Sequence, residues 1–195
     1  MHVHGSFTGQ KVVFEEGECW IIGPDARFEN CEIIVKAHSQ NCIMNGAEFL
    51  DCTIVAKRRL QWDCTKARLA RCTFRGYFQG SDFGHRPPPN GDSDFGAIAD
   101  CDFSKVTLHG CQFFGCDLRT IKLPSWPCFT ILDPGNVFET INGKPLSGNL
   151  HLLFKVAVPG ELACCDYAPR VAQECDVTED EVLHFVQANQ HVIRA

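Results

Sequence analysis

The chain has 195 residues, of which 45% are hydrophobic and 22% charged, and its formal net charge is −6. This balance excludes a wholly disordered chain and is sufficient for one ordinary core. No apolar run approaches the roughly 20 residues that cross a bilayer, and the polar start of the chain lacks the apolar segment of a secretory signal. We therefore expect a cytoplasmic protein without membrane contact.

The 13 cysteines predict a structural role. They include no C-x-x-C pair, so we expect no metal site and no cofactor. An odd number leaves at least one thiol unpaired in a monomer, and a cytoplasmic chain keeps its thiols reduced. The cysteines recur about every ten or twenty residues, which indicates small buried side chains in a repeat.

Residues 1–25 are predicted to form an N-terminal cap. The segment at 11–14 is a short strand candidate, and an acidic turn separates it from an apolar strand candidate at 19–22. A solenoid end exposes unpaired strand edges, so a segment that covers the first coil is expected there.

Groups of five residues begin at Ala26 and run without a gap from Gly96 to Leu123. A small residue and a large apolar residue two places later precede each of Cys31, Cys52, Cys72 and Cys101. A period of five fits neither an amphipathic helix nor an alternating strand, so we predict a turn every five residues and coils of about twenty residues. The count would place Arg59 and Gln79 inward, and we expect local bulges there that turn Arg59 outward.

The step from Cys72 to Cys101 is longer than the others because it contains a Pro- and Gly-rich excursion at 81–95. Prolines cannot join a central strand ladder, so this segment is predicted to leave the coil.

Residues 125–195, the C-terminal lobe, have lost the repeat and are predicted to cap the solenoid. An apolar run at 128–132 stops at the turn residues 133–135, and the apolar run at 149–158 fits either a strand or a buried helix. One short helix broken by Pro169 is expected within 161–175. Thr178 and Glu181 form a predicted capping box that starts a terminal helix.

The repeat from about residue 26 to 123 resembles the pentapeptide-repeat family. This resemblance implies a mainly β fold, a right-handed four-sided β-helix of about five coils over residues 26–124, with the third residue of each five inward and the first beside it. The implied core comprises Phe28, Ile33, Phe49, Ile54, Leu69, Phe74, Ile98, Phe103, Leu108, Phe113 and Leu118, with Cys31, Cys52, Cys72, Cys101, Cys111 and Cys116.

Candidate binding residues lie on the outward places and on the excursion. Lys57, Arg58, Arg68, Arg71 and Arg75 are predicted to form one basic stripe on adjacent coils. The excursion adds Asp82, His85, Arg86, Asp92 and Asp94.

A catalytic role is not predicted, because no phosphate loop or nucleophile motif is present. An enzyme site in the C-terminal lobe would use Cys165 and His184 as a Cys/His pair.

Charge decides between the remaining hypotheses. Residues 1–124 hold 14 basic and 15 acidic residues, and residues 125–195 hold 4 and 9. Family members that protect DNA topoisomerases resemble B-form DNA through dense rows of carboxylates, which this nearly neutral repeat lacks. Negative net charge and inward aromatics also disfavour direct nucleic-acid binding. We therefore expect a non-catalytic protein-binding scaffold of the immunity or antitoxin type, with a toxin or a nucleic-acid enzyme as partner. Self-association through the solenoid end or the lobe is a further option.

Overall fold

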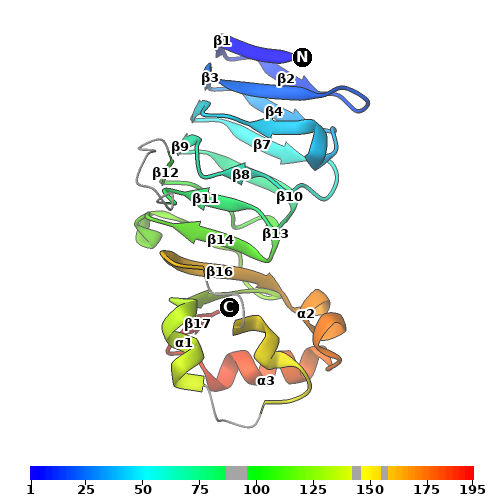
Figure 1. Cartoon of the computed structure of the whole chain (residues 1–195), viewed down its shortest axis with the longest axis vertical. Helices are drawn as coiled ribbons and strands as arrows, with labels where there is room; N and C mark the ends of the chain where they lie inside the picture. Colours follow the sequence, from blue (N-terminus) through cyan, green and yellow to red (C-terminus); the bar gives the residue numbers. More distant parts are fainter. Residues whose placement is uncertain (87–95, 142–145, 155–157) are drawn as a thin grey trace.

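The computed structural model describes residues 1–86, 96–141, 146–154 and 158–195. Its strands wind into a β-solenoid of about four turns in these residues, followed by a pair of helices at the C-terminal end. The coils stack along the long axis of the molecule, from β1 at one end to the C-terminal lobe at the other (Figure 1). The mainly β solenoid predicted from the five-residue period is confirmed.

Parallel pairing between successive coils builds the walls of the solenoid. One wall holds β1 (His2–Thr8), β3 (Trp20–Glu29), β6 (Glu48–Leu50), β9 (Arg68–Ala70) and β12 (Ala97–Ala99), with β5 (Cys42–Met44) beside β3. The next holds β2 (Lys11–Phe14), β4 (Glu32–Val35), β7 (Thr53–Ala56), β10 (Thr73–Gln79) and β13 (Val106–His109). A further wall holds β8 (Asp63–Cys64), β11 (Asp82–Gly84) and β14 (Cys111–Phe114).

Residues in register on successive coils place identical or similar side chains on top of one another. Phe28 stacks on Phe49 with ring centroids 4.8 Å apart and planes 7° apart. Phe74 stacks on Phe103 at 4.2 Å and 9°. Offset parallel stacking of this kind adds to the free energy of burial. The predicted inward residues are buried except for Cys116 and Leu118, which are half-buried and pack against the core from the η2 turn (Leu118–Thr120).

One corner of the coil explains the cysteine period. The residue before each of Cys31, Cys52, Cys72 and Cys101 adopts a left-handed conformation, with φ between 53° and 55°. The thiols behind this corner bond to carbonyls: Cys31 Sγ to Phe7 O at 3.4 Å and Cys72 Sγ to Phe49 O at 3.3 Å, each in the preceding coil. Cysteine fits this position because it is small, apolar and a weak donor.

The five-residue count slips by one place where polar residues would have pointed inward. Leu60 and Phe78 fill the interior instead of Arg59 and Gln79, and they form a parallel bridge with each other. Arg59 is exposed, as expected.

Residues 1–25 are not a separate cap, because they form the first coil of the solenoid itself. β1 and β2 pair in parallel with β3 and β4, and Phe7 stacks on Phe28 at 4.9 Å. The strand candidate at 11–14 coincides with β2, and the candidate at 19–22 overlaps the start of β3, which begins one residue later at Trp20.

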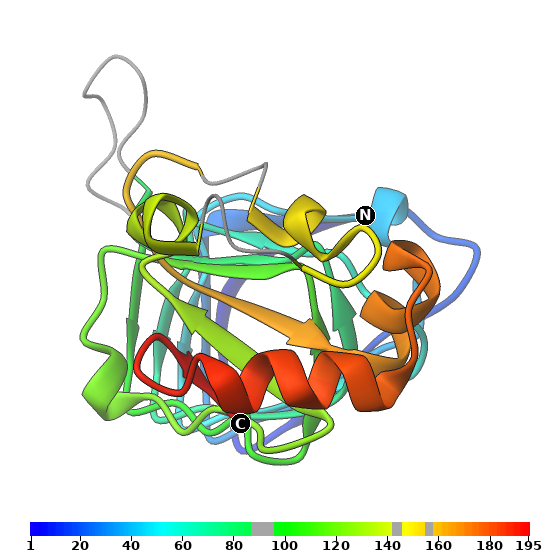
Figure 2. The ribbon, with the colours of Figure 1, turned by 90° about the horizontal axis from the view of Figure 1, so that it is seen from below.

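The C-terminal lobe closes the other end by reversing strand direction. β16 (Glu161–Tyr167) pairs antiparallel with β14 on one side and with β15 (Cys128–Leu132) on the other, and β15 pairs with β17 (Ile193–Arg194). Figure 2 shows α3 (Glu179–Ala188), α2 (Ala168–Cys175) and α1 (Pro134–Ile141) around these strands, across the solenoid end. The lobe has its own apolar cluster, which includes Phe129, Val171 and Phe185.

Two predictions for the lobe are corrected. Pro169 was expected to break a helix, but it lies in the first turn of α2. Proline is tolerated there because the first amides of a helix have no intrahelical acceptor. In the run at 149–158, for which a strand and a buried helix were both open, the structure has the short 3₁₀ helix η3 (Leu150–Phe154), and residues 155–157 lie outside the described residues. The capping box of Thr178 and Glu181 is present at α3, as expected. None of the helices in the described part of the chain is long and apolar enough to cross a membrane.

Candidate functional site

Two of the predicted binding arginines lie in ion pairs with the preceding coil. Arg71 donates two hydrogen bonds to the Asp51 carboxylate, from Nε to Oδ1 at 2.7 Å and from Nη2 to Oδ2 at 2.6 Å. This hydrogen bonding lowers the pKa of Asp51. Arg68 lies 3.8 Å from Glu48, which also faces Arg27 at 3.6 Å. All of these groups are at the surface, so the pairs stabilise the fold little and mainly neutralise the wall.

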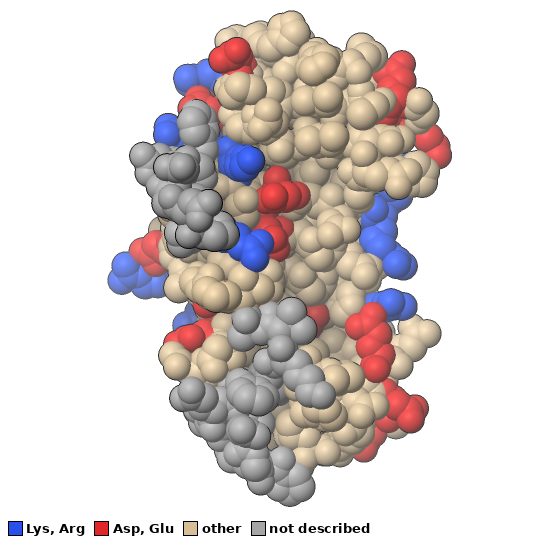
Figure 3. Space-filling model, viewed as in Figure 1, with Lys and Arg blue, Asp and Glu red and all other residues tan. Residues whose placement is uncertain are grey.

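Arg58 is engaged in the same way, with Nη2 2.8 Å from Glu16 and Nη1 2.7 Å from His38. Lys57 and Arg75 are exposed. The predicted single basic stripe is not formed, because Arg68 belongs to the wall of β9 and Arg75 to the wall of β10. In Figure 3, Lys and Arg side chains accordingly lie toward both lateral edges.

The excursion predicted at 81–95 begins too early, because Asp82–Gly84 form β11 in the wall of the solenoid and Phe83 is buried in its core. Asp82 pairs with Arg86 at 3.0 Å, and burial raises the pKa of Asp82 against the opposing charge of Arg86. The Arg86 guanidinium also lies 4.9 Å from the ring centroid of Phe114, and the His85 amide donates to the Phe114 carbonyl at 3.0 Å. The predicted residues Asp92 and Asp94 lie outside the described residues.

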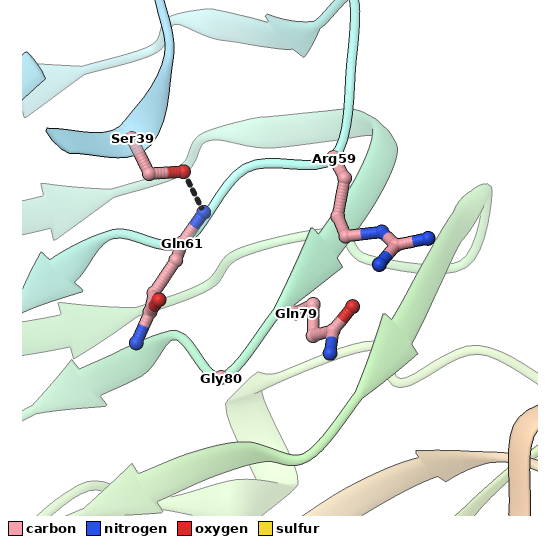
Figure 4. Close-up of a pocket in the computed structure, with 5 residues that line it drawn as sticks. All are labelled: Ser39, Arg59, Gln61, Gln79 and Gly80. Atoms are coloured by element: carbon pink, nitrogen blue, oxygen red, sulfur yellow. Dashed lines mark hydrogen bonds between the residues drawn. The ribbon is translucent and has the colours of Figure 1, made fainter. Parts of the chain in front are cut away.

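A polar groove opens on the side of the solenoid beside the 3₁₀ turn η1 (Ser39–Asn41). It has a volume of about 260 Å³ and is lined by Ser39, Arg59, Gln61, Gln79 and Gly80. Figure 4 shows Arg59 and Gln79 on one side of the groove and Ser39, whose hydroxyl accepts from the Gln61 amide at 2.8 Å, on the other.

Gln79 Oε1, in the lining of this groove, is buried without a hydrogen-bond partner among the described residues, and so is the hydroxyl of Tyr77, two residues earlier on β10. Arg59 lies over the Tyr77 ring at 5.5 Å and pairs with no described carboxylate. Burial raises the pKa of Tyr77, while the charges of Arg59 and Arg170 oppose the shift. The groove therefore offers the cation of Arg59 and an unsatisfied oxygen of Gln79.

A second cleft, which we call the junction cleft, has a volume of about 320 Å³ and lies where the last coil meets the C-terminal lobe. Its walls come from the corner between β13 and β14, from β16, from α2 and from η3. The lining residues are His109, Gly110, Gln112, Pro134, Leu152, Leu153, Glu161, Cys164, Asp166 and Glu174.

His109 links the solenoid to the lobe in this cleft. Its Nδ1 lies 3.0 Å from Asp166 Oδ1 and its Nε2 3.3 Å from Glu174, while Asp166 Oδ1 accepts from the Gly110 amide at 2.8 Å. Burial disfavours the imidazolium, but the hydrogen bond and charge of Asp166, with the charge of Glu174, outweigh it and raise the pKa of His109. The triad joins elements that are far apart in sequence.

Glu161 is a buried carboxylate of the junction cleft with one oxygen that lacks a hydrogen bond from the described residues. It is only 7% exposed, and while its Oε2 accepts from the Val158 amide at 3.1 Å, its Oε1 has no hydrogen-bond partner among the described residues. Burial raises the pKa of Glu161, while hydrogen bonding to the Val158 amide and to the Gln112 and Cys164 side chains opposes that shift.

The possible enzyme pair is not brought together. Cys165 is fully buried with Sγ 3.1 Å from the Thr130 hydroxyl, whereas His184 is exposed and its Nδ1 contacts the Asp180 carbonyl of its own helix. Burial raises the pKa of Cys165, and that of Cys164, well above the usual range. Neither thiol is thus poised as a thiolate nucleophile. In the described part of the chain, no group of three or more His, Cys, Asp or Glu side chains is placed to hold a metal ion.

Sequence reasoning missed both the polar groove and the junction cleft. His109 stands on an outward place of its five, a position that fits any polar residue, and Asp166 and Glu161 follow no motif. The one available signal for the groove was the slip in the count at Arg59 and Gln79. Comparisons with family models, curated proteins and solved structures gave no match for this chain.

Proposed function

We propose that this chain is a pentapeptide-repeat β-helix that binds a partner protein without catalysis, as an immunity or antitoxin type of inhibitor. The observation that carries the proposal is the polar groove, in which Arg59, on the connection between β7 and β8, lies beside Gln79 at the end of β10 with its unsatisfied Oε1. Rigid presentation reduces the ordering cost of binding, and buried unpaired polar atoms favour a complex that pairs them.

The surface charge supports this function over DNA mimicry. A DNA mimic needs an unbroken row of carboxylates where phosphates would lie. Here carboxylates alternate with cations of the neighbouring coil: Glu15 with Lys36 at 2.9 Å and Glu32 with Lys11 at 3.2 Å. Topoisomerase protection is therefore our second candidate, and an enzyme site in the lobe the third.

We also propose that the protein works in the cytoplasm. All 13 cysteines lie in described residues and are unpaired thiols. A chain with so many free thiols is suited to a reducing compartment.

The test is a binding experiment with a charge reversal in the groove. Tagged protein would be used to capture partners from the native host at increasing salt, and the affinity of a captured partner would then be measured for wild type and Arg59→Glu. We expect at least a tenfold loss for Arg59→Glu, which corresponds to about 1.4 kcal/mol. The matched control is Arg119→Glu, an exposed arginine on η2 that pairs with Asp117 at 2.7 Å.

The proposal fails if no polypeptide is retained, or if Arg59→Glu binds as tightly as wild type while both variants remain folded. Retention of topoisomerase subunits as the sole partners would establish the second candidate instead.

A further inference from the structure

We propose that the junction cleft binds a guanidinium group, the head of an arginine-like molecule or side chain. This site is separate from the polar groove, and the proposal does not depend on the proposed function. It rests on three features of the cleft: its buried carboxylate, the negative charge left after its internal ion pairs, and its apolar wall.

The buried carboxylate of Glu161 is the first feature. A carboxylate oxygen that is removed from water without a hydrogen bond carries a large desolvation cost unless a ligand pairs with it. Glu161 is the first residue of β16, and its backbone pairs with Phe114 of β14. A cation bound in the cleft would offset this buried negative charge.

The second feature is the negative charge that remains after the internal pairs are counted. Arg170 lies 2.8 Å from Glu174 and neutralises it. Glu161 and Asp166 stay without a Lys or Arg partner among the described residues, and His109 is their one basic neighbour. Acceptors on different walls suit a planar group with donors in several directions, which favours guanidinium over ammonium.

The third feature is the apolar wall formed by Pro134, Leu152 and Leu153. The aliphatic stem of an arginine-like ligand packs on such surfaces while its head reaches polar groups. Leu152 is 41% exposed, which is unusual for a large apolar side chain in this protein and places unburied apolar surface at the cleft. A volume of about 320 Å³ is at the lower end for ligand sites and fits one such side chain.

The experiment titrates the full chain with N-acetylarginine amide and with the capped peptide Ala-Ala-Arg-Ala-Ala, by calorimetry or by NMR of the His109 ring. N-acetylcitrulline amide is the neutral control of equal shape. We expect saturable binding of both arginine probes and none of citrulline. Equal affinity for the two arginine probes indicates a free small molecule as the natural ligand, and at least tenfold tighter peptide binding indicates a protein-borne arginine.

Variants locate the binding. Glu161→Gln keeps the shape and removes the charge, so we expect a loss of tenfold or more, while Glu179→Gln on the exposed start of α3 should bind as wild type. Leu152→Ser should weaken binding severalfold without affecting folding, because Leu152 is at the surface. Citrulline binding as tight as that of arginine, no arginine binding at all, or unchanged binding by folded Glu161→Gln would each overturn the proposal.

Discussion

At the scale of single residues, the cysteines are packing residues rather than reactive groups. Burial raises the pKa of Cys42 and of Cys111 to about 12, so both stay protonated at neutral pH. Such thiols are poor nucleophiles and resist oxidation. Cys19 differs from the other cysteines because it lies in an exposed turn before β3.

The thiols should therefore divide into one fast class and one slow class. We expect native protein to react rapidly with Ellman's reagent at a single thiol, and all 13 thiols to react after denaturation. Cys19→Ser should remove the fast phase, whereas Cys31→Ser should leave it unchanged. Two or more fast equivalents in the native protein would contradict this assignment of exposure.

At the scale of elements, β10 shows how one strand turns a corner of the solenoid. Its first half pairs with β7 and its second half, from Gly76, pairs with β13. The bend requires φ of 102° at Gly76, and a Cβ there would lie 2.2 Å from the Ala56 carbonyl oxygen of the preceding coil. Only glycine allows both the conformation and the close approach of the two backbones.

Gly76→Ala should accordingly destabilise the protein by roughly 3 kcal/mol or more, since strain and a backbone clash combine. Gly110→Ala is the matched control, because φ is 58° there but the nearest atom to a Cβ is 4.0 Å away. It should cost only about 1–2 kcal/mol. Urea unfolding monitored by circular dichroism measures both, and similar losses for the two variants would show that the Ala56 contact is unimportant.

At the scale of the whole molecule, the contact between His109, Asp166 and Glu174 joins the solenoid to its C-terminal lobe. The folded state raises the pKa of His109 above the ordinary 6.5, so it favours the imidazolium. The stabilising contribution is fully present below that ordinary pKa and is lost as the pH rises through the raised one.

We therefore expect the unfolding midpoint of the wild type to fall between about pH 6 and pH 9 by an amount that His109→Gln lacks. His191→Gln, which alters an exposed histidine, should keep the wild-type profile. The midpoint is measured by urea titration at each pH. Parallel profiles for wild type and His109→Gln would refute a role of His109 ionisation in docking the lobe.

The sequence alone determined the solenoid, its inward residues and the cap of α3. A turn every five residues is a local property, because a large apolar residue in each third place can be buried only if the chain bends at that interval. The same reasoning placed Phe28, Phe74 and Phe103 inside. It also placed an irregularity at Arg59 and Gln79, where the burial of Leu60 and Phe78 shifts the count by one place.

The tertiary structure alone decided which charges meet. Arg58 reaches Glu16 across 42 positions and His109 reaches Glu174 across 65. The first contact depends on how the coils are offset, and the second on the reversal of β16 against β14. No local pattern specifies either one, because outward positions accept any polar residue. For that reason the amino-acid sequence predicts the architecture, whereas the polar groove and the junction cleft exist only once coils and lobe are packed.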